Sequence, residues 1–568
     1  MFSRGPWARA SPGGDAPTLR PGRQTISLSL RCGPHCGEYP WLVDRLTGMA
    51  EHFERHSRTF SLLTFASRVT GLARDAALSR IFGAAGVMDT FFFAFIIPNL
   101  FRRLFGEGAL AAAFLPAYAQ LEKDDPATAK RLASLTIALL VVVLGGITLL
   151  GEAALYLISH HADHQHLGVR LMMIMLPYMP MVCVVAILGA MLQVRGRFGP
   201  SAAAPIVLNI CLITAAVGML PLLGAEDRTA HISAVAGAVI LAGLLQVAWF
   251  VWALRNRRWW ARDFAAARGP MRRVLRQAGP MILGLGVLQL NTFFDSLIAS
   301  YPSMIGATIF GVDYPLKEGA LSAVSFAQRL YQFPLGVFGI AIATAIFPAL
   351  ARLTDDDEAF AGILRRGLRL VVFVGLPASA GLMLIARPLA TVIYQGRAFS
   401  SDDAQRVAFV VLGYACAVWA YSMIHVLTRA FYARGDAKTP VKIAVSMVAL
   451  NLALNCTLIW TPLREAGLAW STAICATIQA IALVMVVRRH AGDILDAEVV
   501  YSWAKSLMIT VVMVVIAGIV SMGLPDALTW LGSLVKLLAV VIVGALVVFA
   551  AAGALRMPEL WWAVGRRE

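Results

Sequence analysis

Apolar segments of about 20 residues recur along almost the whole chain, and each is long enough to cross the hydrocarbon core of a bilayer. The 568 residues are 59% hydrophobic and only 14% charged, with a mean hydropathy of +0.71. Soluble globular domains carry roughly 25% charged residues, so this composition excludes an ordinary soluble protein. Because helices satisfy their own backbone hydrogen bonds in lipid, the sequence predicts an all-α polytopic membrane protein.

Hydropathy windows of about 19 residues predict about fourteen transmembrane helices. The first, second, seventh and eighth cover residues 60–82, 89–119, 274–300 and 320–349. Lys and Arg concentrate in alternate loops, most densely in RNRRWWARDFAAARGPMRRVLR between the sixth and seventh helices. The positive-inside rule therefore predicts that these loops and both termini are cytoplasmic. This distribution accounts for the net charge of +16, and no nucleic-acid binding is expected.

An internal repeat divides the predicted helices. FLPAYAQL at 114–121 resembles IFPALARL at 346–353, and VRGRFGPSAAAPIVLN at 194–209 resembles ARGDAKTPVKIAVSMVALN at 433–451. The order is the same in both halves, which predicts two six-helix lobes related by a parallel repeat plus two extra C-terminal helices, an architecture typical of transporters. The predicted segments are a disordered or untranslated leader (1–48), the N-terminal lobe (49–254), a basic cytoplasmic linker (255–273), the C-terminal lobe (274–490) and the last two helices with a basic tail (491–568).

Cysteine and histidine patterns give no metal or disulfide framework. Five of the seven cysteines lie in apolar runs, which is typical of buried thiols. The segment from Cys32 to Cys36 supplies only three metal ligands with its histidine, and HHADHQH at 160–166 is a short exterior loop. No metal site is expected at either place, and no nucleophile elbow or zinc-protease motif indicates an enzyme.

Arginines inside the predicted membrane segments are the most informative polar residues. Arg68 and Arg74 lie in the first helix, Arg102 in the second and Arg329 in the eighth. Ionisable groups at this depth normally face a partner or a wet cavity. A guanidinium binds phosphate oxygens at two points and stays charged, so several arginines in one cavity favour a diphosphate. The alternative is that such side chains reach phosphate headgroups at a helix end, as expected above all for Arg80 and Arg103.

Glycines near these arginines predict irregular helices. Gly71 lies between the two arginines of the first helix, which lie about 120° apart on an ideal helix. Gly106 and Gly108 follow the arginines of the second helix. We therefore expect both helices to be irregular where they line a cavity.

A second polar group is expected in the C-terminal lobe. Asp295 lies in the seventh helix, Asn451 and Asn455 lie one turn apart on the eleventh, and Thr472 lies in the twelfth. A carboxylate, two amide oxygens and a hydroxyl form a ligand set for a hard cation. The same residues also suit a polar contact between helices, and the sequence leaves both possibilities open.

Three segments carry a family resemblance. SRVTGLARDAALSRIFG (67–83), DTFFFAFIIPNLFRRLFGEGALAAAFLPAYAQ (89–120) and FAQRLYQFPLGVFGIAIATAIFPALAR (326–352) resemble the MurJ (MviN) lipid II flippases. These belong to the superfamily of multidrug, oligosaccharidyl-lipid and polysaccharide exporters. The likeness runs from about residue 60 to the C-terminus.

The resemblance implies a transporter, not an enzyme. It implies alternating access that moves undecaprenyl-pyrophosphate-linked peptidoglycan precursor from the inner to the outer leaflet of the bacterial inner membrane, as cell wall synthesis and cell shape require. The implied partners are lipid II, membrane lipids and the cell-wall synthesis machinery. The last two helices would form an apolar groove for the lipid tail. No cofactor is implied beyond Na⁺ or the membrane potential as a driving force.

Family positions coincide with the arginines and the second polar group singled out above, and they add the acidic residue at the start of the second helix. The implied substrate-binding residues are Arg68, Arg74, Arg102, Arg329 and Asp89. The implied Na⁺ ligands are Asp295, Asn451, Asn455 and Thr472.

This chain also departs from the family pattern. Gln328 and Gln332 stand where members often carry Asp and Glu, so Arg329 is expected to depend on substrate or on another helix for neutralisation. Asn455 is a weaker cation ligand than the Asp of other members. Three alternatives remain: an exporter of drugs or of another polyprenyl-linked saccharide, a polyprenyl-phosphate-using enzyme, and a scaffold that transports nothing.

Overall fold

The computed structural model describes residues 40–106, 108–161, 167–223, 227–255, 259–524 and 529–563. Internal contacts divide the chain into Met1–Arg58 and Thr59–Glu568, and the description below concerns the second unit. Most of the predicted leader, including the Cys32–Cys36 segment, lies outside the described residues. Helix α1 begins at Pro40, within the predicted leader.

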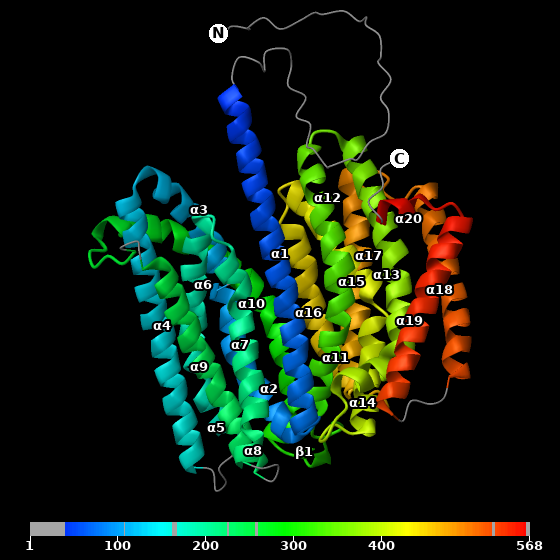
Figure 1. Ribbon diagram of the computed structural model, residues 1–568, viewed down its shortest axis with the longest axis horizontal. Helices are drawn as coiled ribbons and strands as arrows, with labels where there is room; N and C mark the ends of the chain where they lie inside the picture. Colours follow the sequence, from blue (N-terminus) through cyan, green and yellow to red (C-terminus); the bar gives the residue numbers. More distant parts are fainter. Residues whose placement is uncertain are drawn as a thin grey trace, which may run out of the picture. The chain divides into compact units, whose positions relative to one another are not determined.

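Helices are the only regular elements among the described residues of the first half of the chain (Figure 1). A π-helical turn, η2, separates α2 from α3. The elements are α1 (Pro40–Phe82), α2 (Gly86–Phe101), η2 (Arg102–Gly106), α3 (Ala109–Asp124), α4 (Pro126–His161), α5 (Leu167–Met175), α6 (Tyr178–Val194), α7 (Gly199–Gly218), α8 (Leu220–Leu223) and α9 (Arg228–Leu254).

The second half repeats this pattern and adds a small hairpin. A second π-helical turn, η4, separates α11 from α12. The elements are η3 (Ala265–Ala267), α10 (Arg268–Met304), β1 (Thr308–Ile309), β2 (Val312–Asp313), α11 (Ala320–Pro334), η4 (Leu335–Gly339), α12 (Ile340–Arg352), α13 (Asp357–Tyr394), α14 (Ser401–Ala415), α15 (Val418–Ala433), α16 (Lys438–Leu458), α17 (Ala466–Ala491), α18 (Ala497–Gly523), α19 (Trp530–Ala554) and α20 (Pro558–Ala563). Strands β1 and β2 pair antiparallel, with Thr308 opposite Asp313.

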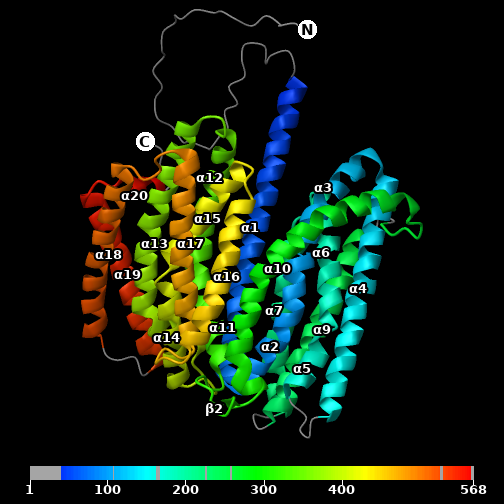
Figure 2. The same ribbon diagram turned by 180° about the vertical axis from the view of Figure 1, so that it is seen from behind.

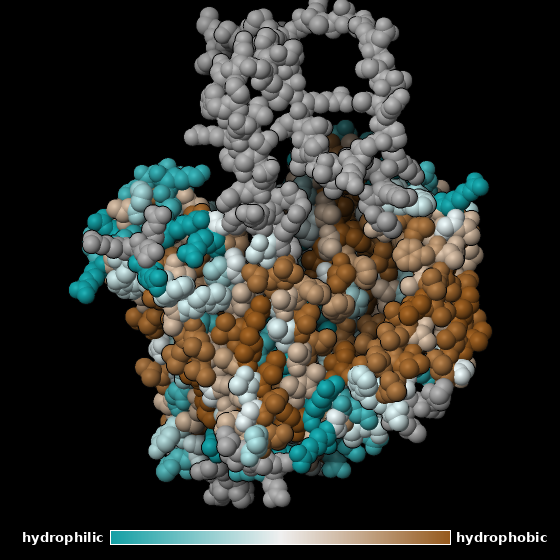
Figure 3. Space-filling model, in the orientation of Figure 1, coloured by the Kyte–Doolittle hydropathy of each residue, from teal (hydrophilic) through white to brown (hydrophobic). Residues whose placement is uncertain are grey.

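The prediction of an all-α polytopic fold is confirmed. In the described residues, ten helices are long and apolar enough to cross a membrane, or eleven if α14 and α15, bent by 42°, form one span. The further predicted spans coincide with α1, with the α2–η2–α3 run and with α10, which carry the polar residues singled out above. On the face shown in Figure 3, apolar side chains form a band between more hydrophilic ends. The count of fourteen stays a prediction.

Packing joins the helices into two groups. In the first, α9 packs on α6 and α7, and in the second, α13 packs on α14 and α15. Helix α10 contacts α2 and α3 of the first group as well as α11 and α16 of the second, and Figure 2 shows it beside α16. Helices α18 and α19 pack against α13. Residues of α2, α10 and α11 therefore meet where the two groups approach each other.

The two π-helical turns support the internal repeat. Each interrupts a long helix, and Pro116 of α3 and Pro348 of α12 follow the turns at similar spacing. The irregular second helix predicted from its glycines is thus observed as η2, which ends at Gly106. Helix α1 is different: it is unbroken from Pro40 to Phe82 despite Gly71.

Candidate functional site

A buried carboxylate holds two of the predicted arginines together. Asp75 of α1 is only 3% exposed. Its Oδ1 accepts a hydrogen bond of 2.6 Å from Nη2 of Arg74, and its Oδ2 accepts one of 2.7 Å from Nε of Arg329. One carboxylate therefore shares its single negative charge between two guanidinium groups, and the ion pair with Arg329 connects α1 to α11 across the two groups.

A second residue that sequence reasoning did not select fixes Arg74. Nη1 of Arg74 donates to Oδ1 of Asn209 on α7 at 3.1 Å. The amide nitrogen of Asn209 donates in turn to Oγ1 of Thr70 at 3.1 Å and to the carbonyl of Ser67 at 3.3 Å. Arg74 is therefore held on both sides, and its side chain is only 12% exposed.

Arg329 differs from Arg74 in exposure. Its side chain is 42% exposed, whereas that of Asp75 is 5% exposed. One part of this guanidinium is therefore held by a carboxylate while the rest remains open to a ligand. Asp75 pairs with both Arg74 and Arg329, so neither guanidinium is an unpaired charge in the cavity. For Arg329, the expected neutralising partner on another helix is Asp75.

Arg68 lies six residues before Arg74 and has a different environment. It is exposed, and within the described part of the chain it makes no hydrogen bond or ion pair. Its guanidinium lies against Gly336 of η4, where a Cβ atom would overlap it. Arg68 thus offers its donors beside the same helical segment that carries Arg329.

The two arginines of η2 are bound by amide side chains. Arg102 donates from Nε and Nη2 to Oδ1 of Asn99, at 3.0 and 2.8 Å. Nη1 of Arg103 donates to Oε1 of Gln289 on α10 at 3.3 Å. We call Asp75, Arg74 and Arg329 the Asp75 cluster. No described contact joins Arg102 or Arg103 to this cluster, so a role of Arg102 in substrate binding stays a prediction.

Asp89 ties α2 to the second group of helices. It is fully buried, and its oxygens accept hydrogen bonds from Oγ of Ser303 at 2.8 Å, the Gly319 amide at 2.7 Å, the Ser322 amide at 2.7 Å and Oγ of Ser322 at 2.6 Å. This carboxylate caps the start of α11. Asp89 therefore positions helices here, and its predicted contact with substrate is not part of this geometry.

The same end of the molecule contains further contacts between the two groups. The amide of Ala398 donates to the carbonyl of Arg80 at 3.0 Å, and Oγ of Ser79 donates to the carbonyl of Tyr394 at 3.2 Å. Gly83 allows this approach, because a Cβ atom there would overlap the Ala398 carbonyl. Nη2 of Arg80 also donates to the Val392 carbonyl at 3.2 Å. We call this set of contacts, with those of Asp89, the α1–α2 seal.

Removal of the Asp89 carboxylate should loosen the seal. Asp89→Ala leaves the donors of Ser303, Gly319 and Ser322 without their acceptor, at a cost of about 2–4 kcal/mol for charge-assisted bonds. Spin labels at the exposed positions 228 and 317 should then lie farther apart, as measured by pulsed electron paramagnetic resonance. An unchanged distance distribution would contradict the role assigned to Asp89, and Asp89→Asn, which keeps one acceptor oxygen, should give an intermediate result.

The predicted ion ligands meet as a second cluster. Nδ2 of Asn455 donates to Oδ1 of Asp295 at 2.5 Å and to Oδ1 of Asn451 at 3.0 Å. The amide of Asn451 lies 3.4 Å from Oγ1 of Thr472. Asn291 donates to Oδ2 of Asp295 at 3.4 Å. The four predicted residues are thus neighbours on α10, α16 and α17.

Two members of this cluster were missed from the sequence. They are Asn291, one turn before Asp295, and Ser471, whose hydroxyl donates to the side-chain oxygen of Asn455. The cluster offers one carboxylate, amide oxygens and hydroxyls, and this donor set fits Na⁺. In the observed orientation Asn455 presents its N–H to Asp295, so this amide would have to rotate to ligate a cation. No group of three His, Cys, Asp or Glu side chains suited to a metal occurs among the described residues.

The remaining sequence candidates lie only partly within the described residues. Residues 162–166 of the histidine-rich loop lie outside the described part of the chain, and His160 stacks on Tyr156. The five cysteines of the apolar runs are free thiols, but the prediction that they are buried holds only for Cys183 and Cys475.

Comparison with known proteins decides the family. The family profile described as "Lipid II flippase MurJ" matches residues 78–542. The chain belongs to the MurJ family. It is 32% identical over 420 residues to the probable lipid II flippase MurJ of Vibrio cholerae serotype O1, covering 70% of this chain and 76% of the relative. It is 31% identical to that of Rhizobium tropici (80% and 84% covered) and 30% identical to the lipid II flippase MurJ of Burkholderia cenocepacia (76% and 83% covered).

Solved structures agree on the fold. A structure titled "Lipid II flippase MurJ, inward closed conformation" superposes with a TM-score of 0.71 at 21% identity, covering 88% of this chain and 99% of that one. An inward-facing multidrug resistance MATE family transporter of the MOP superfamily gives 0.60 at 14% identity, covering 75% and 95%. The MurJ family fold therefore applies to nearly the whole chain, which is a multi-pass membrane transporter.

Proposed function

We propose that this chain is a lipid II flippase that binds the pyrophosphate of its substrate at the Asp75 cluster. The observation that carries the proposal is a buried carboxylate holding Arg74 and the half-exposed Arg329 between the two groups of helices, in a chain of the MurJ family. A diphosphate needs several cationic donors, and neutral drugs or sugars do not.

Asp75 gives the arginines their geometry. It fixes one side of Arg329 and leaves the outer nitrogens for phosphate oxygens, while Arg68 beside Gly336 supplies a second set of donors. Because Arg68 lies on α1 and Arg329 on α11, one diphosphate can contact both groups of helices. Binding would then replace part of the attraction between Asp75 and Arg329, which allows the two groups to move relative to each other.

Alternating access follows from the α1–α2 seal. By the positive-inside rule this end of the molecule faces outside, and both termini are cytoplasmic. The headgroup enters from the cytoplasmic side while the seal is closed. The seal then opens and releases the headgroup to the outer leaflet of the inner membrane. The seal consists of hydrogen bonds and of close backbone contacts at glycines, and such contacts can break and re-form without unfolding a core.

Helices α18 and α19 suit the lipid tail. They pack on α13 and expose apolar side chains along their length, including Leu507, Val511, Leu538 and Leu546. An isoprenoid chain can remain in the bilayer against this surface while only the polar headgroup crosses.

The driving force is proposed to be Na⁺ at the Asp295 cluster, together with the membrane potential.

A cluster that already contains a carboxylate gains affinity for a cation when a second carboxylate is added. Asn455→Asp should therefore make the thermal unfolding temperature of the purified protein rise with NaCl relative to choline chloride, because two carboxylates this close repel each other without a cation. If the unfolding temperature of Asn455→Asp does not change with Na⁺, the proposed ion site is contradicted. Asn455→Leu is the matched control and should show no response.

The function is tested by replacing an essential native flippase with this chain. We expect growth and wall synthesis to be restored. If growth fails although the chain inserts, and cells instead export cationic dyes or another polyprenyl-linked saccharide, the exporter alternative replaces this proposal. The enzyme and scaffold alternatives predict no lipid movement in any assay.

A further inference from the structure

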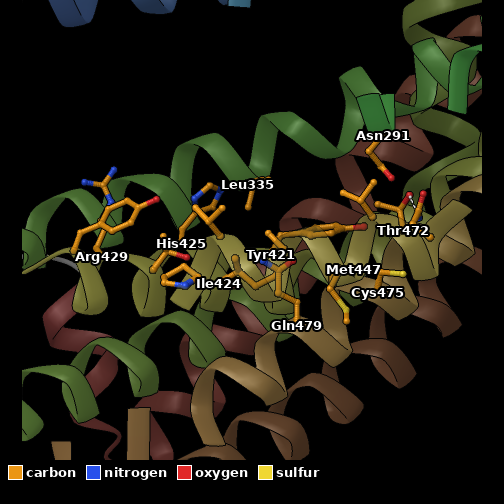
Figure 4. A pocket seen from close by; sticks show the side chains of 18 of the residues that line it. Asn291, Leu335, Tyr421, Ile424, His425, Arg429, Met447, Thr472, Cys475 and Gln479 are labelled. Atoms are coloured by element: carbon orange, nitrogen blue, oxygen red, sulfur yellow. Dashed lines mark hydrogen bonds between the residues drawn. The ribbon is translucent and has the colours of Figure 1, made fainter. Parts of the chain in front are cut away.

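A cavity of about 730 Å³ lies within the second group of helices, apart from the Asp75 cluster. Helices α15, α16 and α17 form most of its wall, and the α11–η4–α12 run covers it (Figure 4). In Figure 4 Arg429 lies at one end and Asn291 and Thr472 at the other, with His425 and Tyr421 between them. The cavity is therefore elongated along the helices.

Two helix faces define its length. On α15 the lining residues run from Tyr421 to Tyr432, and on α16 from Pro440 to Asn451. Eleven residues of α-helix rise about 16 Å, so the cavity spans roughly half of a bilayer core. The end of the cavity that carries Arg429, called the outer end below because it is the end away from the Asp295 cluster, lies at the short connection between α15 and α16. The charge bias of the loops places this connection on the cytoplasmic side.

The inner end reaches the Asp295 cluster. Asn291, Asn451 and Thr472 all line the cavity, and Asn291 donates directly to Oδ2 of Asp295. Asp295 itself is 7% exposed. The cavity thus connects a buried carboxylate with the α15–α16 connection.

Polar side chains occur along the whole wall. His425, Thr428 and Gln479 line the middle part, which is otherwise apolar. The hydroxyl of Tyr421 is buried on this wall, and among the described atoms it has no hydrogen-bond partner. Buried hydroxyls normally bond to protein or to ordered water, so this group indicates that water enters the cavity.

Arg429 places a positive charge near the outer end. In the described residues it forms no ion pair, and its guanidinium lies 5.9 Å from the centre of the Phe347 ring. A fixed charge beside a narrow, partly apolar path acts strongly on small ions because the local dielectric is low. Anions are therefore favoured over cations at this end.

We propose that this cavity is a water-filled shaft connecting the Asp295 cluster with the cytoplasmic side, and that Arg429 sets its charge preference. A cation exchanges with the cluster through the shaft, and Arg429 keeps that exchange slow, so that cations do not leak through the cluster between transport cycles. The inference rests on the proposed ion coupling and on the predicted orientation.

Thiol labelling of a cysteine-free variant in sealed vesicles tests the shaft. Ala444→Cys places a reporter on the wall, Val445→Cys places one on the outer surface of α16, where Val445 is 38% exposed, and Ala437→Cys marks the α15–α16 connection. Each is treated with membrane-impermeant anionic and cationic methanethiosulfonates. We expect Ala444→Cys to react from the side that labels Ala437→Cys and Val445→Cys to remain unlabelled.

Arg429→Gln tests the charge preference. With Arg429 present the anionic reagent should react faster at position 444, and Arg429→Gln should shift the ratio towards the cationic reagent by roughly 3- to 30-fold. The proposal is overturned if position 444 is no more reactive than 445, if it reacts only from the other side, or if the ratio is unchanged. Labelling does not depend on lipid movement, so these results are distinct from a failure to flip lipid II.

Discussion

Asp75→Asn should abolish lipid II flipping and destabilise the protein at the same time. The substitution keeps the shape of the side chain but removes the charge that Arg74 and Arg329 share. Arg74 is nearly buried, so its guanidinium would lose its counter-charge in a place where water cannot replace it. The expected loss of unfolding free energy is about 3 kcal/mol, lower than for a fully buried pair because Arg329 is half-exposed.

Thermal unfolding of the detergent-purified variant and lipid II exposure in vesicles measure the two effects. Asp75→Glu is the control: it retains the charge and should recover part of both stability and activity. Wild-type stability with full flipping in Asp75→Asn would show that the carboxylate does not hold the arginines in place.

Gly319→Ala should slow flipping by more than tenfold while leaving the chain able to insert. Gly319 has a φ of 85°, which costs other residues about 1–2 kcal/mol, and a Cβ atom there would overlap the backbone carbonyl of Ala84. Its amide also donates to Asp89. The added methyl group therefore strains the backbone and prevents the α1–α2 seal from closing, which removes the inward-facing half of the cycle.

Gly311→Ala is the matched control for backbone strain. Gly311 in the β1–β2 hairpin has a φ of 80°, yet a Cβ atom there would meet nothing within 4 Å. The control should cost similar strain but leave flipping close to that of the parent. Equal losses in both variants would mean that backbone strain, and not the seal, explains the Gly319 result.

The sequence predicted the arginines better than their partners. Charge at membrane depth selects Arg68, Arg74, Arg102 and Arg329 because such residues are costly without a function. Asp75 was visible beside Arg74, but its bond to Arg329 joins residues 254 positions apart and depends on how α1 meets α11. Asn209 ends the 194–209 segment, which sequence reasoning used only as evidence of the internal repeat. Pairings of this kind come from tertiary packing, which local pattern does not contain.

The second cluster was more accessible to sequence reasoning. Asn451 and Asn455 lie one turn apart on one helix, and their meeting with Asp295 is observed. Asn291 could have been found by the same rule, since it lies one turn before Asp295. The surroundings of Asp89 could not be found in this way: the family resemblance implied substrate binding, whereas four donor groups from Ser303, Gly319 and Ser322 enclose its carboxylate.

Hydropathy predicted the fold class because apolar length requires helices in a bilayer. It did not place the π-helical turn η4, because hydropathy does not distinguish such a turn from a continuing helix, although Pro334 directly precedes η4 and Gly336 lies within it. The packing of α10 on both helix groups also lay beyond a hydropathy pattern, which contains no information about neighbours.

The most direct test of the central claim is lipid II exposure by the purified chain in liposomes. An enzyme that cuts only exposed lipid II would score the parent beside Arg329→Ala and Arg68→Ala, with insertion checked in each. We predict rapid exposure by the parent and loss of at least tenfold in both variants. Exposure by the variants at the parental rate, or none by the inserted parent, would contradict an arginine site for the lipid II pyrophosphate.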